Sequence, residues 1–526
     1  MTVNSKKDFF NSYLFIYIVG ILTFAVWLTG AEIAGLIVFV VAASILLATR
    51  RDCSPFVTII CLLTFSLTFT AIPEGIIDGS YDFAKNKEFT ILAAALIGLL
   101  VLSLVIRFCR YGYKGTQKFN MIPAFIFVFV ATALAGLTSD KFDVVSNLKY
   151  ILVYLIAFVM YLVYSSGGLR NFKDYIPRVL YVAGLVALLE TVVYYLRAED
   201  IMEALQYKLL DLGWGISNNI AVILGMAVMM AAYLFVKTDK PLFLVMCGLL
   251  AIGVVFTFSR GNILSVVICM PFLVFVVFRY SNRKKAALAV IAAFVLLGVA
   301  CLIWKWDTFV DIFTRMFEKG AYNADRRHLW GLAISVFAQN PLFGGMSFGM
   351  ATGIESVPHS SLFLIMEYMG IVGLVVFCYH YYQKYGILLK NRSVYTTFVW
   401  LAMAVYLFYS FIDAEFFMVY HNFFVFGLLE ASKQEVVERG DDLSFNLSLP
   451  SWARLAGASL GVITGVYAIY YAVSSVYVDS ASGLISFGEI EYVLFVLMLV
   501  AATLLVAISL GGNRKKNTSG FVRLEA

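Results

Sequence analysis

The side chains of this sequence that could do chemistry are few, and the first is an arginine in an almost purely apolar stretch. Arg260, within the sequence FTFSRGNILS, is the only charged residue between Leu242 and Phe278. A guanidinium is always charged and can hold a phosphate through two parallel donors. Free backbone N–H groups at a helix start would add to the positive field. Arg260, with Asn262 beside it, is therefore a candidate anion-binding site. The alternative is an arginine that only anchors a helical hairpin at its aqueous end.

A second group of candidate residues lies further along the chain. Arg326 and Arg327 are adjacent, and Trp330 begins a helical spacing of apolar residues that would present this basic cluster at one end of an amphipathic helix. His359 follows a proline in the sequence PHSS. Imidazole titrates near neutral pH, so this histidine could act as a general base or donate a hydrogen bond to a sugar or a phosphate. A histidine with no role beyond its place at a helix start is the alternative.

Two carboxylates complete the candidate site. Asp413 and Glu415 fall in a short turn between apolar stretches, where they could hold the arginines in place or contact sugar hydroxyls. The chain has seven scattered cysteines and four histidines, without the spacing of a metal site, and it has no phosphate-binding loop. We therefore expect no metal, no cofactor and no nucleic-acid partner.

The elements that position these residues must be membrane-spanning helices. The composition is 62% hydrophobic and only 14% charged, with a mean hydropathy of +0.88. Apolar stretches long enough to cross a bilayer recur along the chain, and they are continuous rather than alternating. The fold class is therefore predicted to be all-α, a polytopic integral membrane protein with about 16 (12–16) transmembrane helices. The expected spans are 10–29, 32–49, 55–73, 89–107, 121–138, 149–165, 176–196, 216–236, 241–258, 261–278, 286–304, 358–383, 395–411, 414–430, 453–474 and 490–510.

The charges of the connections predict the orientation of the chain. Alternate connections are rich in Lys and Arg, and the positive-inside rule assigns these connections and both termini to the cytoplasm. The apolar run 242–278 would be roughly 55 Å long as one helix, against a hydrocarbon core of about 30 Å, so it must turn near Arg260 on the external side. Three parts are expected: a transmembrane bundle over 1–304, a large external amphipathic helical loop over 305–357, and a second bundle with a cytoplasmic tail over 358–526.

The order of these motifs resembles a known group. A Ser-Arg-Gly at the outer end of a span precedes Arg326 and Trp330, then the sequence NPLFGG, then His359 with glycines eleven and fourteen residues later. This order, with the large external loop, resembles the O-antigen ligase/polymerase superfamily over about residues 250–377.

The resemblance implies a GT-C-like, inverting, metal-independent glycosyltransferase of the bacterial cytoplasmic (inner) membrane. Its donor would be an undecaprenyl-pyrophosphate-linked glycan at the external face. Arg260 and Arg326 would hold the pyrophosphate, with Arg327 as the alternative to Arg326, and His359 would accept the proton of the acceptor hydroxyl or position that group. Trp330, Asn262, Asp413 and Glu415 are expected to contact the substrate.

Two functions follow from this resemblance, and a third comes from another class of protein. The favoured one is a polymerase that joins lipid-linked repeat units into O-antigen, capsule or exopolysaccharide, in the membrane lipid and beside a chain-length regulator and a flippase. The first alternative is an O-antigen ligase that transfers the glycan to a lipid A core or a protein. A transporter of lipid-linked sugars is less favoured, because the candidate residues gather on one face and no internal repeat is visible.

Overall fold

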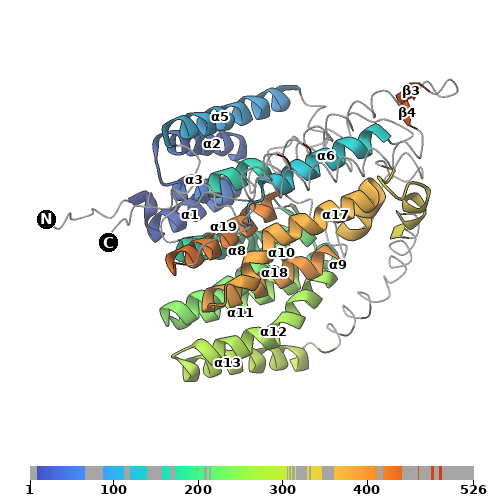
Figure 1. Ribbon diagram of the computed structural model, residues 1–526. Coiled ribbons are helices and arrows are strands. Elements are labelled where there is room, and N and C mark those ends of the chain that lie inside the picture. Colours follow the sequence, from blue (N-terminus) through green and yellow to red (C-terminus); the bar gives the residue numbers. More distant parts are fainter. Residues whose placement is uncertain are drawn as a thin grey trace. The chain divides into compact units, whose positions relative to one another are not determined.

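The structure is a computed structural model of the 526-residue chain, drawn in Figure 1. The residues that it describes are 9–64, 87–111, 119–138, 157–165, 172–206, 210–212, 215–304, 306, 310, 314, 329–330, 333–345, 360–411, 419–440, 456, 460, 476–478 and 485–487. The chain divides into two compact units, each assembled from separate stretches of sequence. Unit 1 comprises Met1–Lys114, Val159–Arg326 and Leu388–Glu435, and unit 2 comprises Gly115–Phe158, Arg327–Ile387 and Val436–Ala526.

Unit 1 contains most of the described helices. In chain order they are η1 (Phe9–Asn11), α1 (Tyr13–Thr29), α2 (Glu32–Thr49), α3 (Ser54–Ile59), the π-helical turn η2 (Ile60–Thr64), α5 (Lys87–Tyr111), α8 (Phe172–Arg197), α9 (Ile201–Gln206), α10 (Ser217–Thr238), α11 (Pro241–Phe256), α12 (Arg260–Tyr280), α13 (Lys284–Trp304), α18 (Val394–Ser410) and α19 (Val419–Glu438) up to residue 435. A two-residue hairpin, β1 (Asp211–Leu212) with β2 (Gly215–Ile216), leads into α10.

Unit 2 is built on two described helices, α6 (Ile122–Thr138) and α17 (Ser361–Lys390), the latter up to residue 387. A short helical stretch at 333–339 and an antiparallel hairpin, β3 (Val476–Val478) with β4 (Ile485–Phe487), belong to the same unit. Residues 157–165 are also helical and pass from unit 2 into unit 1.

These helices confirm the coarse fold class, an all-α polytopic membrane protein. Five of them, α2, α8, α10, α12 and α17, are long and apolar enough to cross a membrane, and α1, α11 and α18 are shorter apolar helices. The expected spans 32–49 and 216–236 match α2 and α10 to within two residues. The count of sixteen, the GT-C-like fold and the division at 304 and 357 stay predictions. The expected spans 453–474 and 490–510 lie outside the described residues, except that Ala456 and Leu460 are helical.

Helix α10 is the core of unit 1. Its whole apolar window is buried, and α8, α11, α12 and α18 pack around it (Figure 1). Small residues bring the helices close together: a Cβ added to Gly184 of α8 would lie 2.3 Å from the Cβ of Ala227 on α10. Such close approach is how helices associate where lipid tails are as apolar as the helices themselves.

One end of unit 1 collects cations, and each is held by a partner from another helix. The buried guanidinium of Arg107 donates to the carbonyls of Arg50 and Arg51, both at 2.8 Å. The guanidinium of Arg178 lies 3.8 Å from the ring centre of Tyr13, and Lys237 forms an ion pair with Asp174. The ends of α2, α5 and α10 and the starts of α1 and α8 therefore share one cation-rich end, as the alternation of charged connections predicts.

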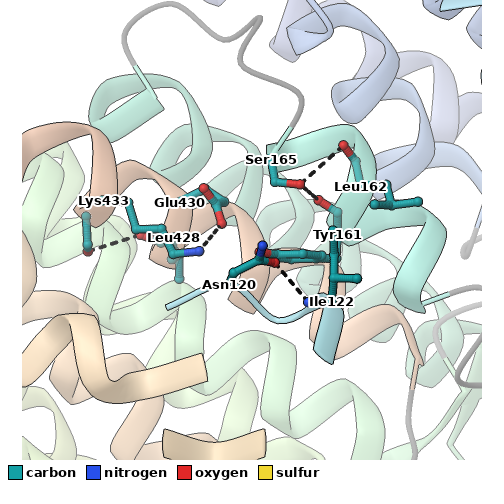
Figure 2. A network of polar contacts seen from close by, with 9 residues as sticks. Asn120, Ile122, Tyr161, Leu162, Ser165, Leu428, Glu430 and Lys433 are labelled. Carbon is teal, nitrogen blue, oxygen red and sulfur yellow. Dashed lines mark hydrogen bonds and ion pairs between the residues drawn. The ribbon is translucent and has the colours of Figure 1, made fainter. Parts of the chain in front are cut away.

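Helix α19 carries a buried ion pair near this end. The ammonium of Lys433 lies 2.5 Å from a carboxyl oxygen of Glu430 and 5.4 Å from the ring centre of Tyr161, and both charged residues are buried (Figure 2). Figure 2 also shows the hydroxyl of Ser165 donating to the carbonyl of Tyr161 at 2.8 Å. The attraction between two opposite charges buried together offsets part of the desolvation penalty that each of them suffers.

In unit 2, helix α17 breaks at Gly370 and the sequence NPLFGG fills the break. Gly370 has φ 59° and ψ −152°, so the helical hydrogen bonds around it are lost. The backbone of 340–345 replaces them: Ile371 donates to the carbonyl of Pro341 at 2.8 Å, Val372 donates to Leu342 at 3.1 Å, and Gly345 donates to Glu367 at 2.7 Å. We call this set of contacts the glycine lock.

Glycine is required on both sides of the glycine lock. A Cβ on Gly370 would lie 2.5 Å from the carbonyl carbon of Leu342, and a Cβ on Gly344 (φ 71°) would lie 2.3 Å from the carbonyl oxygen of Glu367. Both neighbours are backbone atoms, which cannot turn aside as a side chain can. Gly370 and Gly344 therefore serve both as left-handed residues and as spacers.

We expect Gly370→Ala to destabilise the protein by about 3 kcal/mol or more, because a left-handed non-glycine residue is strained and the added methyl overlaps backbone. Thermal unfolding of the detergent-purified protein measures the change. Gly298→Ala in α13 is the matched control, since nothing lies within 4 Å of its added Cβ. Equal melting temperatures for the two variants would contradict the glycine lock.

Candidate functional site

The turn between α11 and α12 places Arg260 at the first residue of a helix. Three residues, 257–259, connect the two helices, as the length of the apolar run predicts. The hydroxyl of Thr257 donates to the carbonyl of Val254 at 2.7 Å, and the backbone of Ser259 donates back to that hydroxyl at 3.3 Å. Phe258 has φ 52°. A left-handed aromatic residue is strained, and such strain is typical of functional turns.

Arg260 is half-buried at this helix start. The backbone N–H groups of the first turn of a helix lack intrahelical acceptors and carry a partial positive charge. The guanidinium and the helix start therefore reinforce one another in attracting an anion. This is the geometry expected of an anion-binding arginine, and Arg260 stays the first candidate for that role.

Asn262 lies in the first turn of α12. It is buried there and holds the 257–259 connection in place. Its amide donates to the carbonyl of Asn218 at 3.0 Å and to the hydroxyl of Ser259 at 3.1 Å. The start of α10 is thereby tied to the turn that carries Arg260. These contacts make Asn262 a positioning residue in the described chain, and its predicted contact with substrate stays a prediction.

The start of α19 joins the same cluster. His421 is buried, its Nε2 lies 3.2 Å from the carbonyl of Asn219, and its ring meets that of Tyr406 edge-on at 6.2 Å. The hydroxyl of Tyr195, near the end of α8, donates to the carbonyl of Phe256 at 2.8 Å. Four helices, α8, α10, α11 and α19, thus fix the start of α12. The Tyr195 contact could not be predicted from the sequence, because one tyrosine among 31 carries no spacing pattern.

In unit 2, Trp330 is half-buried and stacks on Phe363 of α17, with ring centres 5.2 Å apart. Its indole nitrogen has no hydrogen-bond partner among the described residues. Glu367, one turn beyond Phe363, is fully buried, and neither of its carboxyl oxygens has such a partner in the described chain. A carboxyl group inside a membrane span is a functional candidate by default. From the sequence, Glu367 lies too far along the helix from His359 to orient it directly, and only the fold reveals its burial.

The remaining candidate residues lie outside the described residues. They are Arg326, Arg327, His359, Asp413 and Glu415. The structure therefore brings Arg260 together with Asn262 in unit 1, places Trp330 in unit 2, and leaves the roles of the others as predictions. The described residues contain no group of three or more His, Cys, Asp or Glu side chains that could hold a metal ion.

A comparison with models of protein families tests the resemblance to the O-antigen ligase/polymerase superfamily. Residues 243–378 match the family model described as O-antigen ligase. This segment of the chain is similar to the O-antigen ligase family. The resemblance to the O-antigen ligase/polymerase superfamily is confirmed over this segment, which contains α11, α12, α13, the glycine lock and the first half of α17. No curated protein and no solved structure matches the chain.

We expect Asn262→Ala to lower the stability by about 1–3 kcal/mol, because it removes the bonds that the buried amide of Asn262 donates to the carbonyl of Asn218 and the hydroxyl of Ser259. Asn282→Ala is the matched control: its exposed amide donates to Asp239 at 3.2 Å, and its loss should change the stability by less than about 0.5 kcal/mol. Thermal unfolding in detergent compares the two. A shift for Asn282→Ala as large as that for Asn262→Ala would argue against the structural role.

Proposed function

We propose that this chain polymerises undecaprenyl-pyrophosphate-linked oligosaccharide repeat units at the outer face of the cytoplasmic membrane. The observation that carries the proposal is the O-antigen ligase match over 243–378, which encloses Arg260, Arg326 and His359. The half-buried arginine at the start of α12 supports it, because an anionic lipid phosphate is the ligand that such a helix start favours.

The proposed reaction is an inverting glycosyl transfer without a metal. The acceptor hydroxyl oxygen attacks the anomeric carbon of the donor glycan, while the bond from that carbon to the pyrophosphate oxygen breaks. The electron pair of that bond leaves with undecaprenyl pyrophosphate, and the hydroxyl proton passes to His359. Arg260 and Arg326, or Arg327 in its place, stabilise the negative charge that builds on the departing pyrophosphate.

A ligase is the second candidate, and the description of the matching family favours it. A ligase and a polymerase would share the pyrophosphate site and differ in the acceptor, which is a lipid A core or a protein in one case and a second repeat unit in the other. The glycine lock and the α11–α12 connection before Arg260 are compatible with both a ligase and a polymerase, so the acceptor has to be identified by experiment.

Reconstitution with one substrate separates the two. Purified protein in liposomes receives only the lipid-linked repeat unit, and we expect a ladder of longer glycans that is lost in His359→Ala. Transfer that appears only after a separate lipid or protein acceptor is added would make the chain a ligase. Inertness toward both acceptors would contradict glycosyl transfer and favour a transporter of lipid-linked sugars.

Arg260→Ala should lower the rate of transfer by about 10²–10³-fold, since one preorganised group that stabilises developing charge is worth that much. Arg260→Lys should recover part of the rate, because it keeps the charge but loses the two parallel donors. Arg279→Ala is the matched control: it removes an exposed arginine from the opposite end of α12 and should leave the rate unchanged. Equal losses of transfer rate in Arg260→Ala and Arg279→Ala would refute an anion site at Arg260.

A further inference from the structure

Unit 1 has a cavity where α1 ends and α8 passes into α9. Its volume is about 420 Å³. The side chains that give it its character are aromatic or charged: Trp27, Tyr194, Arg197, Glu199, Asp200 and Glu203. The volume falls in the range of small-molecule sites, about 300–1,000 Å³.

Aromatic side chains and hydrogen-bonding side chains line this cavity together. Trp27 and Tyr194 are half-buried and offer aromatic surface, and the guanidinium of Arg197 lies 5.9 Å from the ring centre of Trp27. Glu199 and Glu203 are exposed at the rim, where their carboxylates can accept hydrogen bonds. A sugar ring has an apolar C–H face that packs on an aromatic ring and hydroxyl groups that carboxylates bind well.

The local backbone holds this arrangement in place. Asp200 accepts a hydrogen bond from the backbone of Glu203 at 3.0 Å, which fixes the first turn of α9. Tyr195, next to the lining residue Tyr194, donates to the carbonyl of Phe256 at 2.8 Å. Because α12 begins at Arg260, four residues after Phe256, the cavity and the candidate pyrophosphate site lie at the same end of unit 1.

We propose that this cavity binds a neutral saccharide, namely a sugar of the glycan whose lipid pyrophosphate is held at Arg260. The identification of the ligand as part of that glycan rests on the proposed function. The cavity would hold the glycan at a distance from the reacting bond, so that successive transfers act on the same chain before it is released.

The net charge of the cavity disfavours an anionic lipid headgroup as its ligand. Three carboxylates against one guanidinium leave two negative charges in excess, which repel phosphate and uronic acids. A tryptophan and an arginine alone would fit the aromatic and basic belt at a membrane surface. The carboxylates around an open volume do not belong to such a belt, and they favour hydroxyl-rich neutral ligands.

Saturation-transfer NMR on the full chain in nanodiscs of zwitterionic lipid tests the proposal. The probes are neutral trisaccharides of glucose, galactose, mannose and N-acetylglucosamine, with trigalacturonic acid as the anionic comparison. We expect at least one neutral probe to bind the wild-type protein, and to bind Trp27→Ala at least tenfold more weakly. Binding to the control variant Trp304→Ala should equal that of the wild type, because this tryptophan lies at the end of α13 and is 78% exposed. Glu203→Gln is an isosteric change of an exposed residue. It should lower the affinity for the neutral probe and reduce the ratio of the affinity for the neutral probe to that for the anionic probe.

This measurement needs neither a lipid-linked donor nor turnover, so it is separate from the test of glycosyl transfer. If no neutral probe binds, or if binding is equal in Trp27→Ala and the wild type, the cavity is not a saccharide site even where a ladder is formed. Binding that is lost in Trp27→Ala supports the site even where no transfer occurs. Where a ladder forms, Trp27→Ala should shift it toward shorter products and Trp304→Ala should not; an unshifted ladder in Trp27→Ala would overturn the proposed holding of the growing chain.

Discussion

A backbone without water must find its hydrogen-bond partners inside the protein, and two interruptions of helices in the described residues obey that constraint. At Gly370 the carbonyls of Pro341 and Leu342 accept the N–H groups that the kink releases. At 257–259 the hydroxyl of Thr257 bridges the turn. The motifs that carry the family resemblance are therefore also the places where the backbone leaves the helix and is repaired.

The elements that follow from hydrophobic length could be predicted. The α11–α12 hairpin is an example, since 37 apolar residues cannot cross a bilayer once. The glycine lock could not be predicted in the same way, because NPLFGG and Gly370 lie some 25 residues apart in sequence and the apolar pattern of α17 continues through its break. An isolated glycine in a helical stretch signals either a packing site or a bend, and only the fold decides between them.

The candidate site was predicted by residue type rather than by contact. A lone arginine in an apolar run is conspicuous, and the structure puts Arg260 at a helix start. The contact of Asn262 with substrate stays a prediction, and its amide nitrogen donates to the carbonyl of Asn218 and the hydroxyl of Ser259, because a buried amide needs hydrogen-bond partners within the protein. Unit 1 thus has two different ends. At one end cations are paired with carbonyls, rings and a carboxylate, and the other end holds both Arg260 and the cavity with an acidic rim.

The glycine lock also has a consequence for how this family can diversify. The bond from Gly345 to the carbonyl of Glu367 closes a loop whose two ends are fixed, whatever the conformation of the chain between them. Doubling the length of a closed loop costs only about 0.6 kcal/mol of entropy. Residues 346–358, which precede the proposed proton acceptor His359, could therefore lengthen, shorten or change in sequence without disturbing the helices that anchor them. The loop that precedes His359 could then change the acceptor that the protein recognises as surface sugars change, while the membrane helices stay the same.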